Sequence, residues 1–148
     1  MLELVKMRGL YKSIFACVCL SIGTISSLWS QNSLVIDVHG VPASKGKISI
    51  AIYDSAEDFL KFDKAVTSRS AEAHQGITRL SIDNLPKGEY AVAVFYDANG
   101  NDELDTNWLG VPKEKVAFSK AKMRTFGPPK YKDCCFKVYA DTEISIAL

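Results

Sequence analysis

The sequence predicts an all-β protein, an antiparallel β-sandwich of about seven strands with one short helix. Short segments in which apolar and polar residues alternate recur between residues 31 and 148, and turn-forming residues separate them. One segment, Glu89 to Tyr96, is apolar on both faces, which is typical of a strand in the middle of a sheet. These features together indicate one domain built on a single core.

The strands are expected in a simple order along the chain. Residues alternate at Leu34 to Val38 and at Lys47 to Tyr53, and Pro42 to Gly46 supplies the turn between them. Ser55 can accept the amide of Asp58, so one or two helical turns are expected there. The remaining predicted strands are Val66–Ser70 at an edge, Ile77–Asp83, Glu89–Tyr96, Cys134–Val138 and Ile144–Leu148. The Tyr90 hydroxyl is expected to bond back to the turn before it, as in tyrosine corners of Greek-key sandwiches.

The first thirty residues have the order of a secretory signal peptide. An uncharged apolar run covers Ile14 to Leu28, and Ser30 provides a small residue before a cleavage point at Gln31. The basic residues that precede the run are Lys6, Arg8 and Lys12. We therefore expect a signal peptide at residues 1–30, a sandwich domain at 31–148, and a periplasmic or extracellular protein.

Two alternatives remain for this N-terminal stretch. The first is a membrane anchor, although the uncharged run of roughly fifteen residues is shorter than the ~20 that span a bilayer. The second is a lipoprotein modified at Cys17, although this cysteine lies near the start of the apolar run. No other apolar run of membrane length follows, so no membrane span is expected after cleavage.

The charge of the chain bears on its possible partners, and its cysteine content bears on whether disulfide bonds stabilise it. The formal net charge is +1, from 18 basic and 17 acidic residues, which argues against nucleic acid as a partner. Cys134 and Cys135 are adjacent, and neighbouring Cα atoms lie ~3.8 Å apart, below the usual disulfide range. We expect one packed and one outward thiol and no disulfide framework.

One loop carries candidate metal ligands. Asp97, Asn99, Asn101 and Asp105 occupy positions one, three, five and nine of a segment that directly follows the central strand. Calcium takes six to eight oxygen ligands, which short carboxylate and amide side chains in a bend can supply. The sequence therefore predicts a calcium site at these four residues. The alternative is a solvated connecting loop, because Asp, Asn and Gly favour turns without any metal.

The loop differs from an EF-hand at two positions. Position six is Asp102, where the sharp turn of an EF-hand has glycine, and position twelve is Trp108, where the bidentate glutamate belongs. The preceding element is also a strand, not a helix. A further carboxylate is therefore expected from elsewhere, and the nearest candidates are Asp102, Glu103 and Glu114.

Three ordered blocks of sequence resemble a known family. The blocks are Leu85–Val94, then Asp97–Asn101 with Leu104–Asn107, then Gly110–Glu114 with Phe118–Ser119. They resemble the bacterial secreted family called domain of unknown function 2141. The resemblance implies a signal peptide and a β-sandwich similar to transthyretin-like or immunoglobulin-like modules. It implies no established activity.

Several aromatic residues flank the loop, and their pattern fits either a small packed core or a binding surface. Displayed at one end of a sandwich, they can grip a partner; packed under a long connection, they form a small separate core. They are Trp108, Phe118, Phe126 and Tyr131. Our first hypothesis is a secreted non-enzymatic module, stiffened by calcium, that presents this surface to an unknown protein or glycan of the cell envelope.

Two further hypotheses stay open. A metal-dependent enzyme would use the Asp97–Asp105 loop with Glu114 or His39 as base, and it requires a cleft beside the loop. His39 can equally form a surface pair with Asp37 on the same strand face. The other possibility is a purely structural sandwich without metal.

Overall fold

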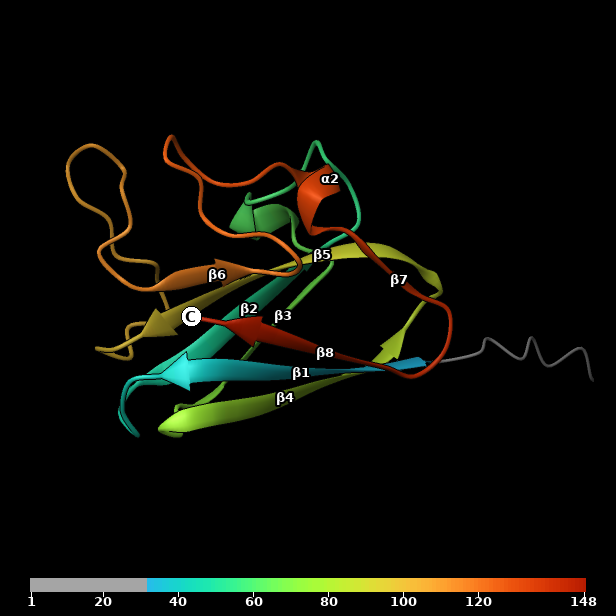
Figure 1. Ribbon diagram of the computed structural model, residues 1–148, viewed down its shortest axis with the longest axis horizontal. Helices are drawn as coiled ribbons and strands as arrows, with labels where there is room; N and C mark the ends of the chain where they lie inside the picture. Colours follow the sequence, from blue (N-terminus) through green and yellow to red (C-terminus); the bar gives the residue numbers. More distant parts are fainter. Residues whose placement is uncertain (1–31) are drawn as a thin grey trace, which may run out of the picture.

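Two β-sheets packed face to face form the framework of residues 32–148 of the computed structural model, the part of the chain that the structure describes (Figure 1). The signal peptide expected at residues 1–30, with its alternatives of a membrane anchor or lipidation at Cys17, lies outside the described residues. Within residues 32–148, no helix is both long and apolar enough to span a bilayer. The predicted mostly β sandwich is confirmed, with eight strands.

The smaller sheet has the order β4-β1-β8. It consists of β1 (Asn32–Val41), β4 (Gly76–Leu85) and β8 (Thr142–Ala147). β1 pairs antiparallel with β4 but parallel with β8, with Leu34 opposite Thr142. The sandwich is thus not antiparallel throughout. A parallel pair needs a long crossover connection, and here almost the whole domain separates the two strands.

The larger sheet is built around β5 (Gly88–Asp97). One edge of β5 pairs with β2 (Lys47–Tyr53), which in turn pairs with β3 (Thr67–Glu72). Its other edge pairs with β7 (Phe136–Val138) near its start and with β6 (Val116–Phe118) near its end. The prediction that Glu89 to Tyr96 forms a central strand is therefore confirmed.

The core lies between the sheets and follows from the period of two along each strand. Every second residue of β1 from Asn32 to Val38 is buried, and so are the positions of β2 and β5 that face them. Fully buried aliphatic side chains in this layer include Leu34, Ile36, Val38, Ile48, Ile52 and Val92. The outward positions of β5 are also largely covered, because loops lie over that face of the larger sheet (Figure 1).

The short helix is not where the sequence placed it. The expected bonds at Ser55 do form: the Asp58 amide donates to Ser55 Oγ at 3.2 Å, and that hydroxyl donates to Asp58 Oδ2 at 3.0 Å. The chain continues as turns, because Leu60 adopts a left-handed φ of 67°, which no helix accommodates. The only helical segments among the described residues are a 3-10 turn, η1 (Phe62–Lys64), and the single-turn α2 (Tyr131–Cys134).

The two adjacent cysteines are free and differ in exposure, as expected. Cys134 is fully buried and Cys135 is half-buried. Burial raises the pKa of the Cys134 thiol to about 11, so this thiol is protonated near neutral pH. Cys135 Sγ donates to the carbonyl oxygen of Tyr131 at 3.0 Å.

The bond predicted for Tyr90 is present. Its hydroxyl donates to the carbonyl oxygen of Pro86 at 2.9 Å, which ties the start of β5 to the turn after β4. The ring itself is buried in the core between the sheets. Tyr90 is thus a structural residue that fixes how the chain enters its central strand.

We predict that Tyr90→Phe lowers the free energy of unfolding by about 1 kcal/mol, because one partly buried hydrogen bond is lost while the ring stays packed. Urea denaturation measures this difference. Tyr139→Phe is the control, because the Tyr139 side chain is exposed and forms no hydrogen bond within residues 32–148. Equal effects of the two substitutions would contradict a specific role for the Tyr90 bond.

Candidate functional site

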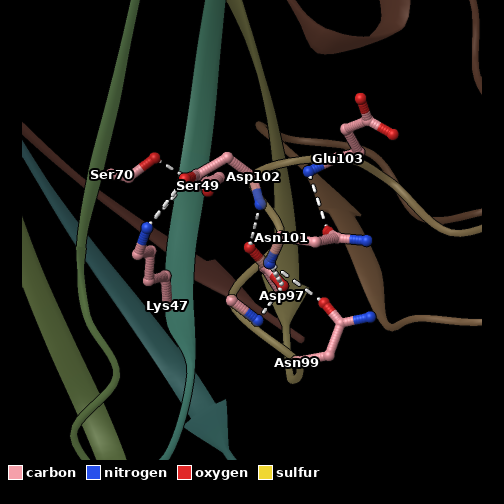
Figure 2. Close-up of polar contacts among 9 residues, drawn as sticks. Lys47, Ser49, Ser70, Asp97, Asn99, Asn101, Asp102 and Glu103 are labelled. Atoms are coloured by element: carbon pink, nitrogen blue, oxygen red, sulfur yellow. Dashed lines mark hydrogen bonds and ion pairs between the residues drawn. The ribbon is translucent and has the colours of Figure 1, made fainter.

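The loop after β5 is organised by the carboxylate of Asp97. This side chain is fully buried at the end of the central strand. Its Oδ1 accepts the amides of Gly100 at 2.6 Å and Asn101 at 3.2 Å, and its Oδ2 accepts the amide of Asp102 at 2.8 Å (Figure 2). Three backbone donors thus surround one carboxylate, which compensates its burial.

The two asparagines of the loop form successive Asx turns. Asn99 Oδ1 accepts the amide of Asn101 at 3.1 Å, and Asn101 Oδ1 accepts the amide of Glu103 at 2.9 Å. An Asx turn joins a side chain to the amide two residues on. The spacing of two that indicates calcium ligands is therefore also the spacing of a chain of Asx turns.

Asp105 closes this cluster. Its Oδ2 accepts the side-chain amide of Asn99 at 2.8 Å, and its Oδ1 accepts that of Asn101 at 3.4 Å. The structure thus brings the four predicted ligands into one connected network, with amide nitrogens of Asn99 and Asn101 directed at Asp105. Among residues 32–148, no three His, Cys, Asp or Glu side chains are grouped so as to hold a metal ion.

Asp102 adopts the backbone conformation that glycine supplies in an EF-hand. Its φ is 63°, in the left-handed region, which costs a non-glycine residue roughly 1 kcal/mol and which Asp tolerates better than most. Lys47 Nζ, from the start of β2, lies 2.8 Å from both carboxylate oxygens of Asp102. This ion pair fastens the strained residue to the neighbouring strand.

Glu114 holds the two ends of the loop together. One of its carboxylate oxygens accepts the amide of Ala98 and the other accepts the amide of Asp105, both at 3.1 Å. Of the three carboxylates considered as an additional ligand, Glu114 and Asp102 therefore both have partners within the loop or next to it. The carboxylate of Glu103 has none within residues 32–148.

Gly46 lets the loop sit directly against the turn before β2. A Cβ atom at this position would lie 2.1 Å from the carbonyl oxygen of Asp97 and 2.9 Å from Cα of Ala98. Gly46 also has a φ of 73°, which favours glycine. The Tyr96 hydroxyl donates to the carbonyl oxygen of Lys45 at 2.8 Å and fixes the same junction.

A groove of about 900 Å³ lies beside the loop, and sequence analysis missed it. Its floor is the outer face of the larger sheet, at positions that alternate with core residues of β2 and β5. Three connections wall it: residues 54–66, 98–115 and 119–130, all on the side of the larger sheet away from the smaller one (Figure 1). Floor residues include Ala51, Tyr53, Ala93, Phe95, Val116 and Phe118, and wall residues include Leu60, Phe62, Leu104, Leu109, Val111 and Met123.

Exposed apolar side chains concentrate at this groove. Of the eleven large hydrophobic residues that are exposed within the described chain, six line it, and they are the six wall residues just named. The available signal in the sequence was a set of apolar residues inside turn-rich connections. It was ambiguous, because such residues also pack beneath long loops.

The four flanking aromatic residues divide into two pairs. Phe118 and Tyr131 pack around Phe59, with ring centroids 6.4 and 5.8 Å from it, in a small separate core. Trp108 and Phe126 are 90% and 94% exposed. Both sequence interpretations, a small core and displayed aromatics, therefore apply to different members of the set.

His39 lies away from the loop. It is on β1 of the smaller sheet, on the outward face, whereas the groove occupies the outward face of the other sheet. Asp37 pairs with Arg79 instead of His39, through two hydrogen bonds of 2.7 and 2.6 Å. These bonds hold the pKa of the Asp37 carboxyl below its ordinary value. The structure thus does not combine His39 with the loop in one site.

Comparison with known proteins identifies a family. Residues 36–147 match the family described as an uncharacterized protein conserved in bacteria (DUF2141). The chain belongs to this family. The resemblance read from the three sequence blocks is thereby confirmed, and the match spans nearly all of the described sandwich. No curated protein and no solved structure matches the chain.

In this DUF2141 chain we predict that Asp97→Asn lowers the free energy of unfolding by about 2 kcal/mol, because a charged acceptor of three amides is replaced by a neutral group with one acceptor oxygen. Chemical denaturation measures the loss. Asp54→Asn is the matched control, because Asp54 is exposed and accepts no hydrogen bond within residues 32–148. A change as small as that of the control would show that Asp97 does not organise the loop.

Proposed function

We propose that this protein is an exported, non-enzymatic module that binds a protein of the cell envelope in the groove, and that calcium stiffens the loop forming one wall. One observation carries the proposal: apolar side chains from three separate connections are exposed around one groove over a sheet floor. Exposed apolar surface that gathers in one place is a mark of an interaction site. A rigid scaffold that displays loops is also a common basis for binding.

A protein partner fits the groove better than a glycan does. Sugars are recognised through many polar contacts, whereas the lining is predominantly apolar. Its few side chains with polar groups are Tyr53, Asp102, Glu103, Arg124 and Thr125. Protein interfaces instead bury apolar and aromatic anchors at their centre. Catalysis finds less support, because both carboxylate oxygens of Glu114 accept loop amides and His39 lies on the other sheet.

The proposed calcium ligands are Asp97, Asn99, Asn101 and Asp105. Support comes from their connection in one network at a single bend. Turning the amide groups of Asn99 and Asn101 about χ2 exchanges their nitrogen and oxygen atoms and directs oxygens toward Asp105. That change gives up both Asx-turn bonds and both side-chain amide bonds to Asp105. We therefore expect weak binding of the kind found in extracellular modules, with a Kd of about 10⁻⁴–10⁻³ M.

Export rests on the basic stretch, apolar run and small residue before Gln31. A periplasmic or extracellular location would also expose the loop to calcium at concentrations that fill a weak site. The proposed location outside the cytoplasm is therefore consistent with the weak calcium affinity that we expect of the loop.

We predict that calcium raises the melting temperature by several degrees relative to a chelator. Calcium at ten to a hundred times its Kd adds about 1.4–2.7 kcal/mol of stability by mass action. Differential scanning calorimetry measures the shift. Asp105→Asn removes it, because Asp105 accepts bonds only from side chains that would rotate, whereas Asp54→Asn retains it. Identical midpoints with calcium and with chelator in the unmodified protein would refute the metal site.

We also predict that the protein recovered from the bacterial envelope begins at Gln31. Signal peptidase cuts after a small residue, and Ser30 provides it. N-terminal sequencing of the purified exported protein identifies the first residue. Recovery of uncleaved chain from the cytoplasm alone would contradict export.

A further inference from the structure

We propose that the groove receives a segment of its protein partner in which a lysine or arginine is flanked by apolar side chains, and that this basic group pairs with Glu103. The inference rests on the proposed role of the groove as a protein-binding site. It adds the chemistry of the segment that the groove selects.

The charges at the groove leave one carboxylate available. Three charged side chains line it: Asp102, Glu103 and Arg124. Asp102 is neutralised by Lys47 at 2.8 Å, and Arg124 is neutralised by Asp133 at 2.5 Å. Glu103 forms no ion pair and its carboxylate accepts no hydrogen bond within the part of the chain that the structure describes.

The direction of Glu103 agrees with this role. Figure 2 shows its carboxylate pointing away from Asp97, Asn99 and Asn101, while its backbone amide is held by Asn101. The side chain therefore lies outside the internal network of the loop but on a backbone that the network fixes. A partner cation that pairs with it disrupts none of the bonds that hold the loop.

The shape of the groove indicates a protein segment, not a small enclosed ligand. Its walls remain open at the rim, where Phe62 is 58% exposed, Leu109 is 64% exposed and Val111 is 53% exposed. A small molecule on the floor would leave these side chains in water. A longer segment covers both the floor and the rim, and the exposed Trp108 and Phe126 adjoin lining residues in the sequence.

The two kinds of contact have different consequences. Apolar anchors in the groove provide most of the affinity, as the buried centres of protein interfaces do. Pairing at Glu103 mainly provides selectivity, because an acidic partner residue there would meet an unpaired like charge. The expected occupant therefore combines a basic residue with apolar neighbours.

The test is a selection from a displayed library of random dodecapeptides on the immobilised full-length protein. We expect enriched peptides to contain Lys or Arg between apolar residues. A synthetic enriched peptide is then titrated by calorimetry, together with a version whose basic residue is replaced by Gln. Glu103→Gln is expected to weaken binding of the basic peptide about tenfold and to leave the Gln version unchanged, while Glu57→Gln, an exposed carboxylate outside the groove, changes neither.

Groove variants separate this inference from the proposed function. The double variant L109S/V111S is expected to abolish binding of both peptides, whereas Ile77→Ser, an exposed apolar position on β4, retains it. If enriched peptides lack basic residues, or if Glu103→Gln has no effect while L109S/V111S abolishes binding, the pairing of a basic residue with Glu103 is overturned. The groove then remains the binding site.

If peptides bind L109S/V111S as they bind the unmodified protein, the groove is refuted as the binding site. If no peptide is enriched and an oligosaccharide on a glycan array binds instead, the protein partner is refuted. All substituted positions are exposed, and thermal melts verify that the variants are folded.

Discussion

A single buried carboxylate, that of Asp97, fixes the start of the loop that forms one wall of the groove. Asp97 ends the central strand and gathers three consecutive amides of the loop that follows. β5 is paired on both edges, so the position of Asp97 is set by the sheet and not by the loop. The hydrogen bonds to Asp97 place the start of the loop relative to the sheet. The next residues, Asp102, Glu103 and Leu104, form part of the groove wall. Without this interaction, the amides of Gly100, Asn101 and Asp102 would lose the buried acceptor that sets their position beside the sheet.

The same network explains why a metal would bind weakly. The loop satisfies its own polar groups, with Glu114 and Lys47 completing the contacts at its ends and at the left-handed Asp102. A cation gains affinity only by replacing some of these bonds. Its free energy of binding is the difference between new coordination and lost hydrogen bonds, which suits a millimolar environment better than a cytosolic one. Calcium would then consolidate a loop that already folds, in place of creating it.

The sequence predicted correctly those features that depend on interactions between residues close together in the chain. The alternation in β1, the two apolar faces of β5 and the bond of Tyr90 to Pro86 all depend on residues close in sequence. The parallel pairing of β1 with β8 was not predictable, because no local pattern states which partner a strand takes across a hundred residues. The helix expected at Ser55 does not form, although its cap bond is present. Leu60 adopts a left-handed φ of 67°, which ends any helical turn at that point.

The candidate site was predicted only in part, for a related reason. The four residues of the loop do converge, yet their spacing serves Asx turns as well as calcium ligation, and only coordinates show where each oxygen points. The groove was missed because its walls come from three connections that are distant in sequence. Exposed apolar residues in separate loops become a surface only when the sheet beneath brings them together.

Hydrogen exchange at the amides of Gly100, Asn101 and Asp102 tests the central claim most directly, because these three donors are the ones bonded to Asp97. The claim predicts that they exchange far more slowly than unbonded loop amides and nearly as slowly as the paired amides of β5, and that calcium slows them further. Exchange at the rate of a free peptide would contradict it, since the loop could not then hold a wall of the groove in place.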